Sequence, residues 1–181
     1  MASIFRDLGA AIVDADEATH AVYAPGADGF ALVVNEFGEE YVREGAIDRA
    51  KLGAYVFANP GALRRLDAIV HPLVRQWMAD KTARAIEDGA EVVIHDVPLL
   101  FENGMQGLYT ATVLAYASPE TQVRRLIELR GLPSERALAM MAAQMPIDEK
   151  KDLADYVIEN DGGIESTRAQ VKEVWAQLQS L

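Results

Sequence analysis

Carboxylates stand close behind two short apolar runs of the chain. Asp14 and Asp16 follow the run at residues 11–13, and Asp96 follows the run at 92–94. Ligands of open α/β sheets bind at the carboxyl ends of the strands, so acidic side chains at these positions are well placed for chemistry. An aspartate that closes an apolar strand is typical of Mg²⁺ sites in phosphoryl transfer, where it reaches the metal directly or through water.

Each of these carboxylates also has an ordinary structural interpretation. Glu17 and a helix-forming stretch follow Asp16, so Asp16 fits the N-cap of a helix as well as it fits a catalytic role. If this segment is extended, Asp14 and Asp16 point to opposite sides and have different tasks. The D-x-D spacing also suits a metal site of the glycosyltransferase kind, and Asp96 also suits a solvated loop.

The segment after Asp96 is a candidate surface for a ligand. A proline stops the apolar run, three apolar residues follow, and an acidic residue closes the segment. These residues are Pro98, Leu99, Leu100, Phe101 and Glu102. The whole heptapeptide D-V-P-L-L-F-E is a far more specific signal than its aspartate alone.

One histidine stands in a distinctive context. His71 lies in I-V-H-P-L-V at residues 69–74, where a lone histidine beside a proline is more often hydrogen-bonded to backbone at a helix junction than bound to a ligand. His20 and His95 have no partner pattern and are interpreted as incidental. Because the chain has three histidines and no cysteine, a zinc site is not expected.

A basic segment from Arg130 to Lys151 is a candidate lid. Arg130 and Lys150 flank an apolar stretch at 137–145, and basic residues on a hinged pair of helices can close over phosphates. A solvated amphipathic helix pair is the alternative. The methionines of this segment are expected to pack in the core, and they are Met140, Met141 and Met145.

Four continuous apolar runs predict buried strands of a parallel sheet, since such strands are covered by helices on both faces. The runs are residues 11–13, 92–94, 112–115 and 156–158. Helical stretches separate them, which predicts an α/β fold with a helical lobe of its own at 19–89. Further helices are expected at 2–8, at 119–131, and at 164–181 with an apolar face from Ile164 to Leu181.

Composition excludes several classes of function. The net charge of −11 argues against nucleic-acid binding, which needs a cationic surface. The absence of cysteine excludes disulfides and thiolate chemistry. No apolar run approaches the roughly 20 residues that span a bilayer, and the first residues lack a signal-peptide pattern. We therefore expect a cytoplasmic protein without membrane partners.

Taken in order, these motifs resemble the dephospho-coenzyme A kinase family. The matching segments include V-D-A-D at 13–16, I-V-H-P-L-V at 69–74, D-V-P-L-L-F-E at 96–102, A-A-Q-M-P at 142–146 and A-D-Y-V-I-E-N-D-G at 154–162. The resemblance covers the whole chain. It implies a three-layer P-loop-kinase fold, whose core is formed by residues 1–18 and 90–181, with an acceptor lobe at 19–89 and a lid at 131–153.

The family transfers the γ-phosphoryl group of ATP to the ribose 3′-hydroxyl of dephospho-coenzyme A. The resemblance implies that Asp16 is the general base and that Asp96 supports Mg²⁺, while Asp14, His71 and the loop 98–102 shape the acceptor site. For the nucleotide it implies Asn160, Gly162, Arg130 and Lys150. The expected ligands are ATP with Mg²⁺ and dephospho-coenzyme A, and the expected state is a monomer or weak homo-oligomer.

The chain departs from the family pattern at one motif. Family members open with a strand followed by G-x-x-x-x-G-K-[ST], and the 181 residues contain no such motif. We expect the natural protein to be longer by roughly 20 residues that carry this strand and loop. Because that strand is central in the family's sheet, we expect unpaired strand edges without it. The alternatives are a non-catalytic module that binds coenzyme A or nucleotide, and another small-molecule P-loop kinase.

Overall fold

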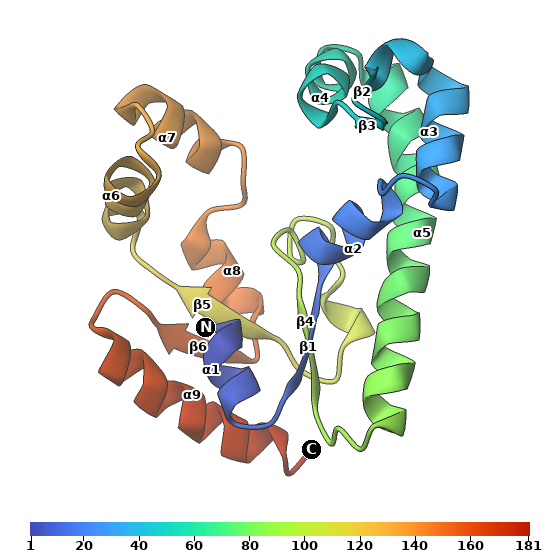
Figure 1. Ribbon diagram of the computed structural model, residues 1–181. Coiled ribbons are helices and arrows are strands. Elements are labelled where there is room, and N and C mark those ends of the chain that lie inside the picture. The colour runs from blue at the N-terminus through green and yellow to red at the C-terminus, as the bar shows by residue number, and fades with distance from the viewer. The chain divides into compact units, whose positions relative to one another are not determined.

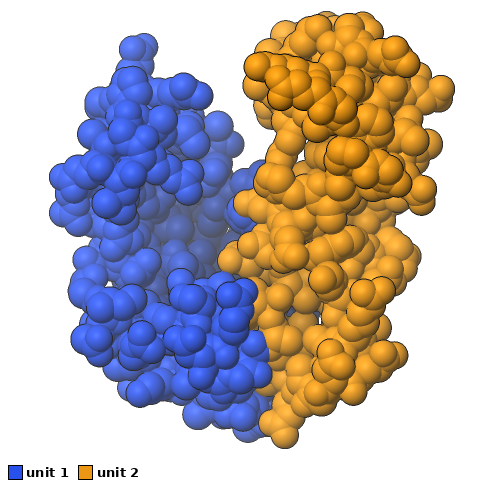
Figure 2. Space-filling view, in the orientation of Figure 1, with its two compact units in different colours: residues 1–10, 98–181 blue, residues 11–97 orange.

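A computed structural model describes all 181 residues of the protein (Figure 1). The chain forms two compact units, which are coloured separately in Figure 2: residues 11–97, and residues 1–10 together with 98–181. The chain therefore passes between the units after Ala10 and again after Val97. None of its helices combines the length and the apolar character that crossing a membrane requires.

The unit of residues 11–97 is built on one parallel strand pair and one long helix. β1 (Ala11–Asp14) pairs with β4 (Val93–Asp96) in a register that sets Asp14 opposite Asp96. The 28-residue helix α5 (Pro60–Glu87) packs against both strands. Side chains of β1, α2 and α5 bury a small core here, formed by Val13, Ala18 and Met78.

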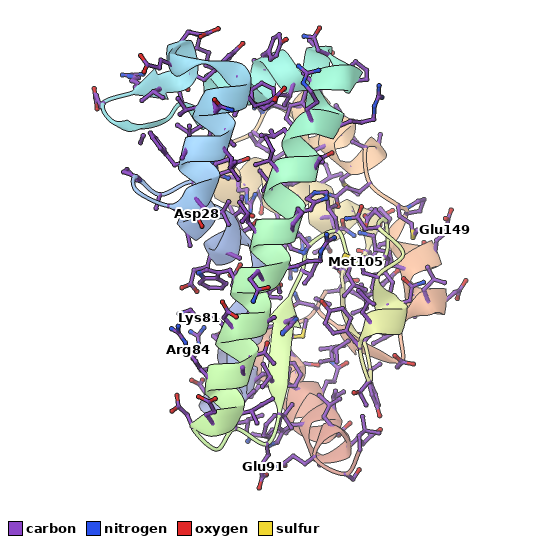
Figure 3. All side chains as sticks on the ribbon, turned by 90° about the vertical axis from the view of Figure 1, so that its right-hand side faces the viewer. Asp28, Lys81, Arg84, Glu91, Met105 and Glu149 are labelled. Atoms are coloured by element: carbon purple, nitrogen blue, oxygen red, sulfur yellow. The ribbon has the colours of Figure 1, made fainter.

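The rest of this unit is a small lobe on the N-terminal half of α5 (Figure 1). Its elements are α2 (Ala15–Val22), α3 (Asp28–Phe37), η1 (Glu39–Tyr41), β2 (Val42–Arg43), β3 (Ala46–Ile47) and α4 (Arg49–Ala58). Their apolar side chains share a second core with α5, and its most buried members are Val33, Leu52, Val56 and Ala62. Lys81 and Arg84, in the C-terminal half of α5, point away from the helix (Figure 3).

The second unit is built on another parallel pair, β5 (Val113–Tyr116) with β6 (Tyr156–Glu159). α9 (Ile164–Leu178) packs on β6 and on α1 (Ala2–Asp7), and the rings of Phe5 and Trp175 lie 6.4 Å apart. The remaining elements are η2 (Gln106–Leu108), α6 (Pro119–Arg130), α7 (Ser134–Ala142) and α8 (Ile147–Leu153).

The predicted strands and helices are largely confirmed. All four strands form within one or two residues of the predicted bounds, and α6 begins at Pro119 and is capped at its C-terminus by Gly131, whose φ is 64°. The hairpin β2–β3 was not predicted, because strands of two residues leave no periodic signal. The predicted apolar face of the last helix is wrong at its ends, since Ile164 is 61% and Leu181 is 70% exposed.

The strands do not join into one continuous sheet. β1–β4 and β5–β6 are separate two-stranded sheets, and they lie in different units. Each pair therefore keeps unpaired backbone groups along its free edges.

Gly29 allows α2 and α3 to approach closely, which gives a test of this packing. A Cβ at Gly29 would meet Val22 Cγ1 and would lie 2.5 Å from the Val22 carbonyl oxygen. We expect Gly29→Ala to lower the free energy of unfolding by about 1–3 kcal/mol, measured by urea denaturation. Gly53→Ala is the matched control, because a Cβ on this helical glycine would meet only the Phe57 ring, at 3.7 Å. A Gly29→Ala variant as stable as wild type would contradict this account.

Candidate active site

Two aspartates lie side by side at the carboxyl ends of β1 and β4. The parallel register pairs Asp14 with Asp96, and Asp16 follows in the first turn of α2. The pKa of the Asp96 carboxyl is raised, first by partial desolvation and then by the negative charges of Asp14 and Asp16. A cation at this point would relieve that repulsion, so the site favours a positively charged ligand.

The donor set for a metal here consists of carboxylates alone. No group of three or more histidine, cysteine or acidic side chains is arranged to hold a metal ion. Mg²⁺ is usually bound by one or two protein carboxylates and completes its shell with water and phosphate oxygens. The paired carboxylates of Asp14 and Asp96 fit that mode of binding.

Asp14, and not Asp16, caps helix α2. Its Oδ1 accepts hydrogen bonds from the backbone N–H groups of Asp16, at 2.7 Å, and of Glu17, at 3.2 Å. The alternative that Asp16 is the cap is therefore wrong. The expectation of alternating sides is also wrong, because the extended backbone ends at Asp14 and α2 begins at Ala15. The exposed carboxylate of Asp16 is thus not used for capping.

His20 braces the turn that carries Asp16. Its Nδ1 lies 2.8 Å from the Asp16 carbonyl oxygen, and its Nε2 lies 2.7 Å from Nη1 of Arg49 on α4. Since a guanidinium only donates, Nε2 accepts from it and Nδ1 carries the proton that is donated to Asp16. Arg49 also lies over the Tyr23 ring, 5.7 Å from its centroid. The interpretation of His20 as incidental is therefore wrong.

The other two histidines lie against α5. His71 lies inside this helix, 60% exposed, with its Nε2 3.6 Å from Oδ1 of Asp67. Its predicted structural role at a helix junction is wrong, because α5 continues through Pro72. His95 on β4 hydrogen-bonds the Thr82 hydroxyl at 2.8 Å and so ties the strand to the helix, which means that it is not incidental either.

The loop that follows Val97 belongs to the other unit and presents only part of the expected apolar surface. Leu99 is 43% exposed, whereas Phe101 is buried. Glu102 turns inward and pairs with Lys150 of α8, with Oε1 and Nζ 2.5 Å apart. Burial acts to raise the pKa of Glu102, but hydrogen bonds from Lys150 and from backbone N–H groups outweigh it and lower that pKa.

A cavity of about 580 Å³ lies between β5, α6 and the α7–α8 segment within this unit. Its lining includes Ala115, Ala117, Pro119, Gln122, Arg125, Met141, Gln144, Met145, Pro146, Ile147, Asp148, Lys150 and Asn160. The cavity brings together Lys150 and Asn160 of the predicted nucleotide residues. Arg130, the last residue of α6, and Gly162 are exposed and do not line it.

Asn160 is fixed at the edge of this cavity by hydrogen bonds on three sides. Its N–H donates to the Tyr116 carbonyl at 2.7 Å, and its Oδ1 accepts from the Thr167 hydroxyl at 3.2 Å. Arg125 Nη2 donates to its carbonyl oxygen at 2.6 Å. Arg125 was not predicted as a site residue, because its partner lies 35 residues away and no local spacing marks the contact.

The candidate lid is a pair of helices, as predicted, but its methionines do not form a core. α7 buries Ala137 instead, while Met140 is 40% exposed. Met141 and Met145 line the cavity. Methionine adapts its shape to irregular contacts, which suits a cavity wall as well as a core.

Because the pKa of Asp96 is raised, replacing its carboxylate with a neutral side chain is expected to increase the stability of the protein, by an amount that depends on pH. A raised folded pKa gives stability that is present below the unfolded value of 3.8 and is lost as the pH rises through the folded pKa. We expect Asp96→Asn to raise the Tm near neutral pH, by roughly 2–4 °C for each kcal/mol of repulsion relieved. Well below 3.8 the two proteins should melt together.

The control for this measurement is Asp28→Asn. Asp28 lies in the first turn of α3, is exposed, and is labelled in Figure 3. Its neutralisation relieves no paired carboxylate, so no gain in Tm is expected near neutral pH. If the two substitutions change the Tm equally, the charged form of Asp96 is not destabilised by burial and by the neighbouring carboxylates.

Comparison with known proteins extends the resemblance. The family model described as dephospho-CoA kinase matches residues 1–166. A dephospho-CoA kinase from Streptomyces avermitilis is 46% identical over 171 residues, which cover 94% of this chain and 82% of that protein. One from Geobacillus kaustophilus is 41% identical over 182 residues, which cover the whole of this chain and 90% of that protein.

Solved structures agree with this match. The crystal structure of TT1252 from Thermus thermophilus has a TM-score of 0.79 and 34% identity, and covers 98% of this chain and 89% of that one. A dephospho-CoA kinase from Campylobacter jejuni has a TM-score of 0.70 at 24% identity, with the same coverage, which supports the fold. The chain belongs to the dephospho-CoA kinase family.

Proposed function

We propose that this protein phosphorylates the ribose 3′-hydroxyl of dephospho-CoA with ATP, the last step of coenzyme A synthesis. The observation that carries the proposal is the cluster of aspartates at the carboxyl ends of β1 and β4, in a chain of this family. Phosphoryl transfer demands little covalent chemistry from a protein, so positioning and charge neutralisation carry the catalysis. Carboxylates on rigid strand ends supply the positioning, and a cation held by them would supply the positive charge.

Asp16 is proposed as the general base. Its carboxylate does not cap α2 and is exposed on the first turn of that helix. His20 and Asp14 form hydrogen bonds with the backbone of the same turn. A base must come within hydrogen-bond reach of the hydroxyl proton it removes, and an exposed side chain on a fixed turn can do so. The acceptor hydroxyl loses its proton to Asp16 as phosphoryl transfer proceeds.

Asp96 is proposed to hold Mg²⁺, directly or through water, while Asp14, which the resemblance assigns to the acceptor site, lies opposite it in the strand register. Partial burial raises the pKa of Asp96 first, and the negative charges of Asp14 and Asp16 add to it; a divalent cation would relieve the part that comes from repulsion. When bound, Mg²⁺ neutralises phosphate charge that the protein alone leaves unpaired. The protein's own part is to keep the two carboxylates in register.

The cavity of the second unit is proposed as the pocket for the base and ribose of ATP. Its volume suits a drug-sized ligand, and its walls combine apolar side chains with polar ones that can orient a nucleotide. Arg125 and Lys150, its two cations, already contact protein oxygens, so they suit the uncharged part of a nucleotide better than its phosphates. Gly162 and Arg130 do not line the cavity, so their assignment to the nucleotide rests on the family resemblance alone.

The acceptor is assigned to the lobe at 19–89 with His71, and the loop 98–102, in the other unit, is assigned to the same ligand from the family resemblance alone. His71 and Leu99 are exposed and can contact a ligand, whereas Phe101 supports the loop from within. The segment 131–153 is proposed as the lid, since α7 and α8 form one wall of the cavity.

A second candidate function is binding without turnover. The 181 residues contain no G-x-x-x-x-G-K-[ST] loop, whose backbone N–H groups and lysine would cradle the phosphates. The cavity and the carboxylates do not depend on that loop, so the chain can bind coenzyme A or nucleotide without catalysing transfer.

One assay separates these functions. The 181-residue chain and a chimaera with a strand and a G-K-[ST] loop from a family member ahead of Met1 are incubated with Mg²⁺, ATP and dephospho-CoA. Formation of coenzyme A, detected by mass spectrometry, supports the kinase. Binding of both substrates by calorimetry with no product from either protein supports the binding module. Phosphorylation of a nucleoside monophosphate instead would support another small-molecule kinase.

The role of Asp16 gives a sharper prediction. We expect Asp16→Asn to lower kcat by about 10²–10⁴-fold in the active form, because the base is lost, with an unchanged Tm. Glu17→Gln is the matched control, since Glu17 is an exposed carboxylate of the same helical turn. Asp16 is not the base if Asp16→Asn retains the kcat of Glu17→Gln.

A further inference from the structure

Lys150 is a lysine with a buried side chain, only 9% exposed. Its ammonium lies 2.5 Å from Oε1 of Glu102, whose own side chain is 17% exposed. The neighbouring pair Lys151–Glu159, at 2.9 Å, is 43% and 49% exposed and so is largely solvated. A buried charge is stable only when it is paired, and the loss of one partner is strongly destabilising. The Glu102–Lys150 pair is therefore a fixed contact, whereas its neighbour is an ordinary surface pair.

Glu102 has a second contact on the same segment. Its Oε1 also accepts a hydrogen bond from the backbone N–H of Met145, at 3.3 Å. Met145 lies in the connection between α7 and α8, and Lys150 lies within α8. One carboxylate oxygen thus holds the connection and the helix that follows it.

Glu102 is itself held by a rigid loop. Backbone hydrogen bonds join Asn103 to Leu99, Gly104 to Phe101 and Met105 to Leu100, at 3.0–3.2 Å. The Phe101 ring is buried beneath the loop. A carboxylate projecting from such a loop is a fixed point for whatever it contacts.

The segment that Glu102 holds forms one wall of the cavity. Met145, Pro146, Ile147 and Lys150 all line it. Glu149, by contrast, points away from α8 (Figure 3), so α8 turns one face to the cavity and the other outward. Because Glu102 neutralises Lys150, this ammonium is a poor site for a phosphate and a good anchor for the wall.

We propose that Glu102 and Lys150 are a positioning pair, which ties the D-V-P-L-L-F-E loop to the wall at residues 145–150 and thereby sets the shape and ligand affinity of the cavity. The identity of the ligand as ATP rests on the proposed function. The tie itself rests on the contacts of Glu102. In this proposal neither side chain needs to touch the ligand, because the pair acts by fixing the position of the cavity wall.

The test is a double-mutant cycle with Glu102→Leu, Lys150→Met and the double variant. The double variant has no buried charge and is expected to fold even where a single variant does not. Two quantities are measured: the Kd for ATP with Mg²⁺ by calorimetry, and the hydrogen-exchange rate of the Met145 amide in the ligand-free protein. Lys151→Met is the matched control, because it removes the surface pair one residue away.

We expect the double variant to bind ATP about tenfold more weakly than wild type, no worse than either single variant, since all three remove the same interaction. We expect the Met145 amide to exchange about tenfold faster in all three, and Lys151→Met to change neither quantity. If the increase in Kd of the double variant equals the product of the increases in the two single variants, the residues act separately on the ligand, and the proposal is overturned. An unchanged Met145 exchange rate would overturn it as well. If the wild-type protein binds no ATP, the assignment of the cavity to a nucleotide fails, and the exchange rates alone decide the tie.

Discussion

Parallel pairing of β1 with β4 brings two like charges together, and the candidate active site depends on this register. Asp14 and Asp96 are opposite each other because the strands pair from Ala11 and Val93 onward without a bulge. Asp14 is compensated by two N–H groups at the positive end of the α2 dipole, whereas the pKa of Asp96 is raised. A slip of one residue would move every side chain of β1 to the other face and separate the pair.

The two units contain carboxyl groups whose pKa values are shifted in opposite directions, Asp96 upward and Glu102 downward. At the strand ends, partial burial and two neighbouring carboxylates raise the pKa of Asp96, and a bound cation would relieve the repulsion between these carboxylates. Glu102 instead receives hydrogen bonds from an ammonium and from a backbone N–H, which lower its pKa and fix it in place. Residues whose charge is not balanced by their neighbours are expected at functional sites. By this criterion Asp96 is a better candidate for a functional residue than Glu102 is.

The cations around the cavity are already engaged. Arg125 donates to the Asn160 carbonyl and Lys150 pairs with Glu102. Transfer of a phosphoryl group needs neutralisation of several phosphate charges, which in P-loop enzymes comes largely from the glycine-rich loop and its lysine. The 181 residues contain no such loop, so within them the carboxylate site is the place where a bound cation would bring positive charge.

The sequence by itself determined the four strands, the main helices and the positions of Asp14, Asp16 and Asp96 at strand ends, because apolar runs and turn residues are local signals. It also determined the family, since the ordered motifs span the chain. Which aspartate caps α2, the brace formed by His20 and Arg49, and the partners of Glu102 and Asn160 were decided only by the tertiary structure. Most of those contacts join residues 29–48 positions apart or depend on where a strand ends and a helix begins, and no periodicity of the sequence encodes either.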